Sequence, residues 1–146
     1  MSLSVCSLAS QLELAFENNQ IPSFDKMLIP IMYSRSDDEP LAFLSQVYPF
    51  DEISEEKEFP IDEIILHLSN EGRVFLFPKL FQYFLNSPDR RSYNLFSSVD
   101  GLLYDYQFAR PKRPTRDWLA SMTVVQLSVI EEVIFELFGL KKADVA

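Results

Sequence analysis

The strongest constraint on the fold comes from residues 69–86, SNEGRVFLFPKLFQYFLN, which hold the densest run of large apolar side chains in the chain. Ser69, Asn70 and Glu71 precede this run and supply oxygen acceptors and a negative charge for the start of a helix. The apolar residues recur at steps of three and four and cover most of the helix circumference, which is typical of a central helix. Pro78 lacks an N–H group and clashes with the carbonyl four residues earlier. We therefore expect a kink or a break there, with Pro78 starting a second segment.

Further helical patterns lie on both sides of this stretch. Apolar side chains at helical spacing predict helices over residues 4–19, 61–68, 92–106 and 123–138, and a short helix begins near Pro40. Thr123 and Gln126 form a capping-box pattern, and Gly139 marks the end of the last helix. Residues 21–36 contain two prolines and no sustained period, which predicts an irregular crossover. We expect an all-α fold: a compact single domain, residues 1–146, of about five to seven helices around a Pro-kinked central helix.

The net charge of −9 is concentrated in the first half of the chain. Residues 1–78 carry 14 acidic and 4 basic side chains, whereas residues 79–146 carry 8 acidic and 9 basic ones. A protein that binds nucleic acid normally has the opposite sign, so a nucleic-acid partner is not expected. A basic protein partner or a cation agrees better with this charge.

The densest acidic segment, DEISEEKE, lies between two phenylalanines and is expected to be a loop at residues 50–59. Its carboxylates could capture a basic partner, with the two aromatic side chains as apolar anchors beside the charge. The alternative is an ordinary solvated acidic loop. The predicted partner-binding residues are Phe50, Asp51, Glu52, Glu55, Glu56, Glu58, Phe59, Asp62 and Glu63.

A second charged segment, RPKRPTR at residues 110–116, is expected to be a basic loop. Its four cationic side chains suit a phosphate or an acidic partner. They could equally be solvated or lie against the protein's own acidic loop. Residues 141–146 are expected to form a frayed tail.

No motif in the sequence is typical of catalysis. His67, the single histidine, has no G-x-S-x-G nucleophile elbow to act on, and Cys6, the single cysteine, has no base nearby. One cysteine also excludes an intramolecular disulfide. Asp37, Asp38 and Glu39 could bind a hard cation, although they also suit the start of a helix. No cofactor is expected, and an enzyme that uses these carboxylates with a metal and His67 is the alternative.

The sequence shows no membrane or export signal. No apolar run approaches the length of a membrane-spanning helix. The N-terminus lacks a basic region followed by a long apolar one, which a secretory signal would have. We therefore expect a cytoplasmic protein with no membrane partner.

Several short motifs resemble a family of small uncharacterised bacterial proteins, known as a domain of unknown function. They are Ala15-Phe16, Leu68-Ser69-Asn70-Glu71-Gly72, Phe77-Pro78 and Thr123-Val124-Val125-Gln126. The similarity covers most of the chain, with Phe77 where the family has Leu and Asn70 where it commonly has Pro. All of these are packing and capping residues, so the resemblance implies a shared fold and carries over no active site.

Size, acidic charge and the lack of a catalytic motif together favour a non-enzymatic protein-binding module. Small acidic single-domain bacterial proteins of this kind are often immunity proteins or antitoxins, which occlude a basic toxin. The alternatives are a carboxylate- or metal-dependent small enzyme and a homodimeric structural or regulatory helical protein.

Overall fold

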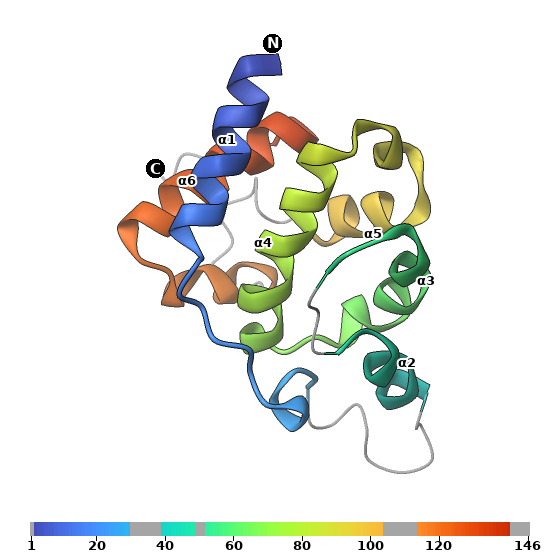
Figure 1. Ribbon diagram of the computed structural model, residues 1–146. Helices are drawn as coiled ribbons and strands as arrows, with labels where there is room; N and C mark the ends of the chain where they lie inside the picture. The colour runs from blue at the N-terminus through green and yellow to red at the C-terminus, as the bar shows by residue number, and fades with distance from the viewer. Residues whose placement is uncertain (1, 30–38, 49–51, 104–113, 141–146) are drawn as a thin grey trace.

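The computed structural model describes residues 2–29, 39–48, 52–103 and 114–140, and it confirms an all-α domain of five to seven helices (Figure 1). The helices are α1 (Ser2–Ala15), α2 (Glu39–Val47), α3 (Glu55–Ile64), α4 (Asn70–Asn86), α5 (Asn94–Leu102) and α6 (Val124–Phe138). Short 3-10 helices lie between them: η1 (Phe24–Lys26), η3 (Ile65–His67), η4 (Pro88–Ser92) and η6 (Pro114–Ser121).

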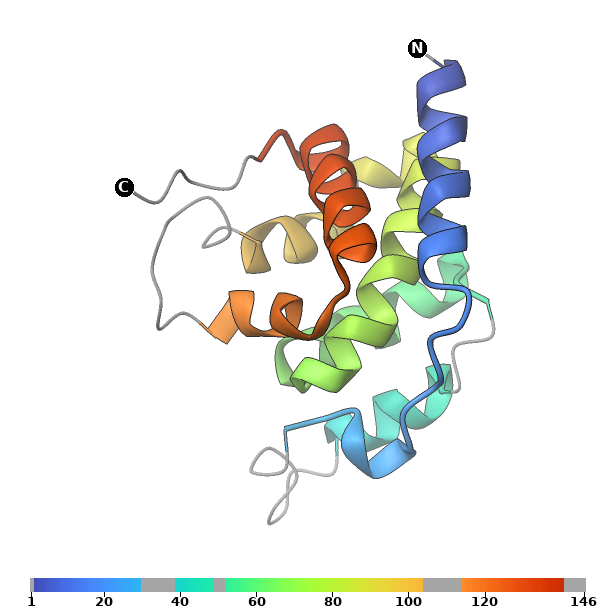
Figure 2. The same cartoon turned by 90° about the vertical axis from the view of Figure 1, so that its left-hand side faces the viewer.

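Helix α4 lies at the centre of the molecule, as its sequence predicts (Figures 1 and 2). It contacts α1, α6, η4 and η6, and α1 and α6 also contact each other. Ser69 caps its start, because the Ser69 Oγ accepts a hydrogen bond from the Gly72 N–H at 3.0 Å. In its middle, Phe77 packs edge-on against Trp118 with the ring centroids 5.0 Å apart, and both side chains are fully buried. The core of the fold is therefore built around this one helix.

Pro78 does not break the central helix, so the expected break and restart are wrong. Helix α4 runs continuously through Pro78, which is buried. A proline inside a helix costs about 3 kcal/mol, because a hydrogen bond is lost and the ring meets the carbonyl four residues earlier. Phe75, Phe77 and Phe81 are buried on either side of it. Since burying one Phe contributes about 1.5 to 3 kcal/mol, the packing of these three side chains outweighs the cost of the proline.

The crossover after α1 is attached to the start of α4. The Ile29 N–H donates to the His67 carbonyl at 2.8 Å, and the Ser69 N–H donates to the Met27 carbonyl at 2.9 Å. Met27 is fully buried. A Cβ at Gly72 would lie 2.4 Å from the Met27 carbonyl oxygen, so only glycine allows this approach.

Both predicted caps of the last helix are confirmed. The Thr123 Oγ1 accepts from the Gln126 N–H, and the Gln126 Oε1 accepts from the Thr123 N–H, each at 3.1 Å. Gly139 ends α6 in the left-handed conformation with φ 68°. The Gln126 Nε2 also donates to the Ala15 carbonyl at 3.0 Å, so this capping residue joins α6 to the end of α1.

The acidic segment is helical from Glu55 onward, so the predicted loop at residues 50–59 is wrong over that part. Helix α3 begins after Ser54, which has an extended backbone, and continues through Pro60 to Ile64. Three glutamates lie in its first turn, where the positive end of the helix dipole stabilises negative charge. The predicted helix over residues 61–68 therefore begins earlier, ends at Ile64 and is followed by η3.

Other boundaries also differ from the prediction. Over the described part of the helix expected at residues 92–106, the structure has the end of η4 and then α5, and residues 104–106 lie outside the described residues. The first helix, expected over residues 4–19, ends at Ala15. Residues 114–116 of the predicted basic loop belong to η6. Residues 110–113 of that loop and the predicted frayed tail at residues 141–146 lie outside the described residues.

Candidate functional site

An exposed aromatic side chain stands on the outer face of α3. Phe59 is 63% exposed. Residues three and four positions away are the surface neighbours of a helical residue, and at Phe59 all four are acidic: Glu55, Glu56, Asp62 and Glu63. Three of them are exposed and Asp62 is half-buried. Helix α3 therefore presents one apolar ring surrounded by four carboxylates, and we call these five residues the Phe59 face.

Helix α2 holds the Phe59 ring in place. The ring packs edge-on against Phe43, with the centroids 5.6 Å apart and the planes at 80°. Helices α2 and α3 also contact each other. Because the Phe59 side chain is already packed on Phe43, it loses less conformational entropy when a partner binds it.

Glu58, a predicted partner-binding residue, points into the protein instead. It is 7% exposed. Its Oε2 accepts hydrogen bonds from the Tyr83 Oη at 2.5 Å and from the Arg90 Nε at 2.7 Å. Glu58 therefore joins α3 to α4 and η4 and does not belong to the Phe59 face.

Arg90, in η4, forms ion pairs with two glutamates of α3, Glu55 and Glu58. Its Nη1 lies 3.5 Å from the Glu55 Oε1, and its guanidinium lies over the Tyr93 ring, 3.8 Å from the centroid. The hydrogen bond to Glu58 raises the pKa of Arg90. Burial and then the hydrogen bond to Glu58 raise the pKa of Tyr83 to about 12. Arg90 is therefore charged and offsets part of the charge of Glu55 and Glu58, while Glu56 and Glu63 of the Phe59 face are exposed to a partner.

The structure brings together some predicted site residues and not others. The five residues of the Phe59 face lie on one side of α3. Glu52 is exposed in the segment that leads into this helix. Phe50 and Asp51 lie outside the described residues.

The structure describes only some of the candidates for catalysis or metal binding. His67 is half-buried in η3, and its Nδ1 is buried without a hydrogen-bond partner. Glu39 is the first residue of α2, and Asp37 and Asp38 lie outside the described residues. Within the four described ranges, no group of three or more His, Cys, Asp or Glu side chains could hold a metal ion.

Sequence reasoning missed the residues that support the Phe59 face. Tyr83 and Arg90 lie 25 and 32 residues from Glu58 in the chain, and Phe43 belongs to a different helix. No short-range sequence pattern links Tyr83 and Arg90 to Glu58, or Phe43 to Phe59. The tertiary fold alone shows which acidic side chain is internal and which are free to face solvent.

Comparison of the chain with protein-family models, with curated proteins and with solved structures found no match. The resemblance to a domain of unknown function therefore stays a prediction. Among the helices of the described residues, none has the length and apolar character needed to cross a membrane.

Proposed function

We propose that this protein is a non-enzymatic binding module that holds a basic protein partner on the Phe59 face, as an immunity protein or antitoxin occludes a toxin. One observation carries the proposal: Phe59 is exposed and has a carboxylate at each of its four surface-neighbour positions. Binding energy in interfaces concentrates in a few apolar or aromatic anchors. The charges around such an anchor contribute specificity for the partner and raise the association rate.

The charge of the face suits a basic partner of protein character. Carboxylates attract Lys and Arg side chains and repel nucleic-acid phosphates. The attraction acts over a Debye length of about 8 Å at physiological salt, so it guides the final approach. The mechanism is steric occlusion with electrostatic steering, and it needs no bond chemistry and no cofactor.

The first experiment tests the anchor. Wild-type protein and a Phe59→Ser variant are immobilised, and a cell extract is passed over each at low salt. We expect the wild type to retain a basic protein that elutes as the salt rises, and the Phe59→Ser variant to lose it. Leu14→Ser is the matched control, because Leu14 on α1 is 66% exposed and lies outside the Phe59 face. Equal retention on the wild type and on Phe59→Ser would refute the proposal.

The second experiment tests the charge with the partner isolated in the first. A Glu56→Lys/Glu63→Lys variant is expected to associate about tenfold more slowly at low salt, with a weaker dependence on salt. Glu58 is left unchanged because it is buried. An unchanged association rate would mean that the partner contacts another face. A partner that keeps its full activity in the complex would rule out occlusion.

A further inference from the structure

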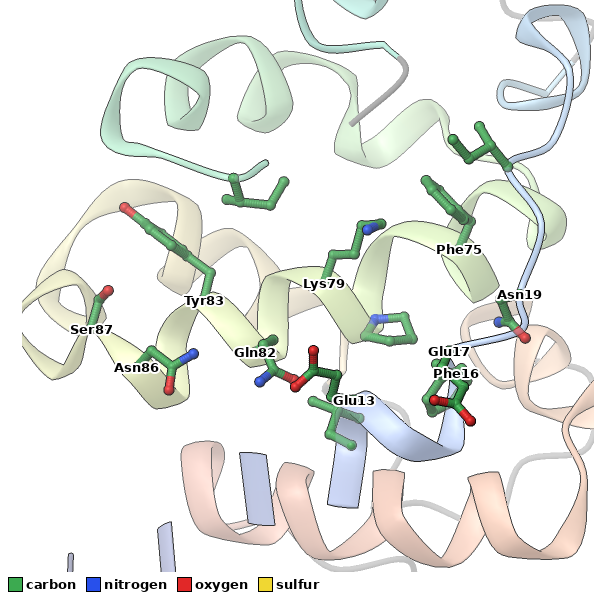
Figure 3. Close-up of a pocket in the computed structure, with 14 residues that line it drawn as sticks. Glu13, Phe16, Glu17, Asn19, Phe75, Lys79, Gln82, Tyr83, Asn86 and Ser87 are labelled. Atoms are coloured by element: carbon green, nitrogen blue, oxygen red, sulfur yellow. The ribbon is translucent and has the colours of Figure 1, made fainter. Parts of the chain in front are cut away.

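A groove of about 820 Å³ follows α4 between α1 and the segment that leads into α3 (Figure 3). Its floor is a stripe of α4 at helical spacing that includes Phe75, Lys79, Gln82, Tyr83 and Asn86. Residues 75 to 86 span about 17 Å of helix, at 1.5 Å per residue. The groove is therefore long enough for about three turns of a second helix.

The two walls of the groove differ in chemistry. Helix α1 and the turn after it contribute the exposed side chains Glu13 and Glu17, which Figure 3 shows on the α1 side. The segment before α3 forms the other wall and contributes Ile53, which packs against the core. Phe16 and Ile21 also line the groove. A ligand that fits it therefore has cationic side chains that face Glu13 and Glu17, beside an apolar surface.

The floor carries one positive charge, which lies over an aromatic ring. The Lys79 Nζ is 5.3 Å from the centroid of the Phe75 ring. The Tyr83 Oη is hydrogen-bonded to Glu58 and leaves the ring of Tyr83 to line the groove. Among the described residues that line the groove, two carry carboxylates and one carries an ammonium group, so together they have a negative net charge.

The backbone of one wall and of the floor favours a helical ligand over an extended one. Helices α1 and α4 use their backbone N–H and C=O groups in their own hydrogen bonds, so that wall and the floor offer no strand edge to pair with. An extended peptide would place its own backbone groups against α1 and α4 without partners, which is unfavourable. A helix satisfies its backbone internally and presents only side chains.

We propose that this groove binds an amphipathic helix of about three turns, with Lys or Arg on the flank that faces Glu13 and Glu17 and apolar residues on the flank that faces Ile53. The basic partner would contribute this helix, so the inference rests on the proposed function for the source of the helix. The binding of a basic helix to the groove can be measured without that partner.

The test uses three fluorescein-labelled synthetic peptides of about four turns: an amphipathic Leu/Lys helix, a scrambled Leu/Lys peptide of the same charge, and an amphipathic Leu/Glu helix. Fluorescence anisotropy is measured near 0.15 M salt, where non-specific attraction is screened beyond about 8 Å. We expect the Leu/Lys helix to bind at least about tenfold more tightly than the scrambled peptide. A Glu13→Lys/Glu17→Lys variant is expected to lose about tenfold in affinity for the Leu/Lys helix and to gain affinity for the Leu/Glu helix.

The matched control is Glu132→Lys/Glu136→Lys, which makes the same charge change at two exposed positions with the same spacing on α6. It should leave the affinity for the Leu/Lys helix within about twofold of the wild type, since those residues are outside the groove. Equal binding of the helical and scrambled peptides, or equal losses in the two double variants, would overturn the inference.

Phe59→Ser separates this inference from the proposed function. It should leave peptide binding to the groove unchanged while it removes retention of the basic partner. If Phe59→Ser weakens peptide binding as much as Glu13→Lys/Glu17→Lys does, the peptide sits on the Phe59 face and the groove inference fails. If peptide binding passes every control while Phe59→Ser still retains the partner, the groove inference stands and the proposed role of the Phe59 face fails.

Discussion

Glu58 and Phe59 are adjacent in the chain but have opposite environments. One step along a helix turns the side chain by about 100°, which places Glu58 against Tyr83 and Arg90 and leaves Phe59 in solvent. The acidic segment therefore divides into an internal carboxylate that joins helices and outer carboxylates that surround an aromatic ring.

Replacing Glu58 tests its internal role. Glu58→Gln keeps the shape but removes the charge that accepts from Arg90, and hydrogen bonds to charged groups contribute about 1.5 to 3 kcal/mol. We expect the free energy of unfolding to fall by about 1 to 3 kcal/mol in urea titrations. Glu56→Gln, at an exposed position of the same helix, should change it by less than about 0.5 kcal/mol. Equal effects of the two substitutions would contradict the internal role of Glu58.

Alkaline pH tests the raised pKa of Tyr83, which burial and then the hydrogen bond to Glu58 produce. The pKa of Tyr83 rises from 10.0 to about 12 in the folded protein. Its contribution to stability is therefore complete below pH 10 and is lost as the pH rises through about 12, because the unfolded tyrosine ionises first. We expect the difference in urea midpoint between wild type and Tyr83→Phe to shrink over that range. A difference that stays constant would show that Tyr83 does not hold its proton more tightly in the folded state.

At the scale of helices, the contact between the crossover and α4 depends on Gly72. An Ala at that position would place its Cβ 2.4 Å from the Met27 carbonyl oxygen, whereas a Cβ at Gly101 in α5 meets nothing within 4 Å. We expect Gly72→Ala to destabilise the protein by about 1 to 3 kcal/mol, as overpacking does. Gly101→Ala should stabilise it by up to about 1 kcal/mol, because Ala favours helices. Thermal unfolding of both variants checks this pair, and a stabilising Gly72→Ala would refute the close approach.

The helices that could be predicted from the sequence are those whose signals are local. Ser69 before α4 and the Thr123–Gln126 box before α6 act within one turn, so short patterns identify them. The start of α3 was missed because clustered glutamates suggest a loop when the helix dipole is left out of account, so the predicted helix began only at residue 61. The continuity of α4 through Pro78 was missed because it depends on packing against other elements, which no local pattern records.

At the scale of the whole molecule, the candidate site could be predicted only in part. Composition places the acidic charge near residues 52–63, and the structure keeps Glu55, Glu56 and Glu63 exposed there. The burial of Glu58 and the support of Phe59 by Phe43 arise from contacts between separate helices. Such contacts follow from the packing of every helix around α4, so they appear only once the fold is known.

The central position of α4 also predicts how the whole protein unfolds. This helix contacts α1 from the start of the chain and both η6 and α6 from its end, so neither end can separate without exposing the core. Trp118, the single tryptophan, is 1% exposed and packs on Phe77 in the middle of α4. Its fluorescence therefore reports on the core, while far-ultraviolet circular dichroism reports on all helices.

We expect the two signals to change together in urea, with one midpoint and one slope, because a domain with a single shared core unfolds cooperatively. Phe77→Leu should lower both midpoints equally, since it loosens the packing on Trp118 at the centre of α4. Fluorescence that changes at a lower urea concentration than circular dichroism would mean that the contact between η6 and α4 opens first. In that case α4 would not be the shared core of the whole domain, and the cooperative unit would be smaller than the chain.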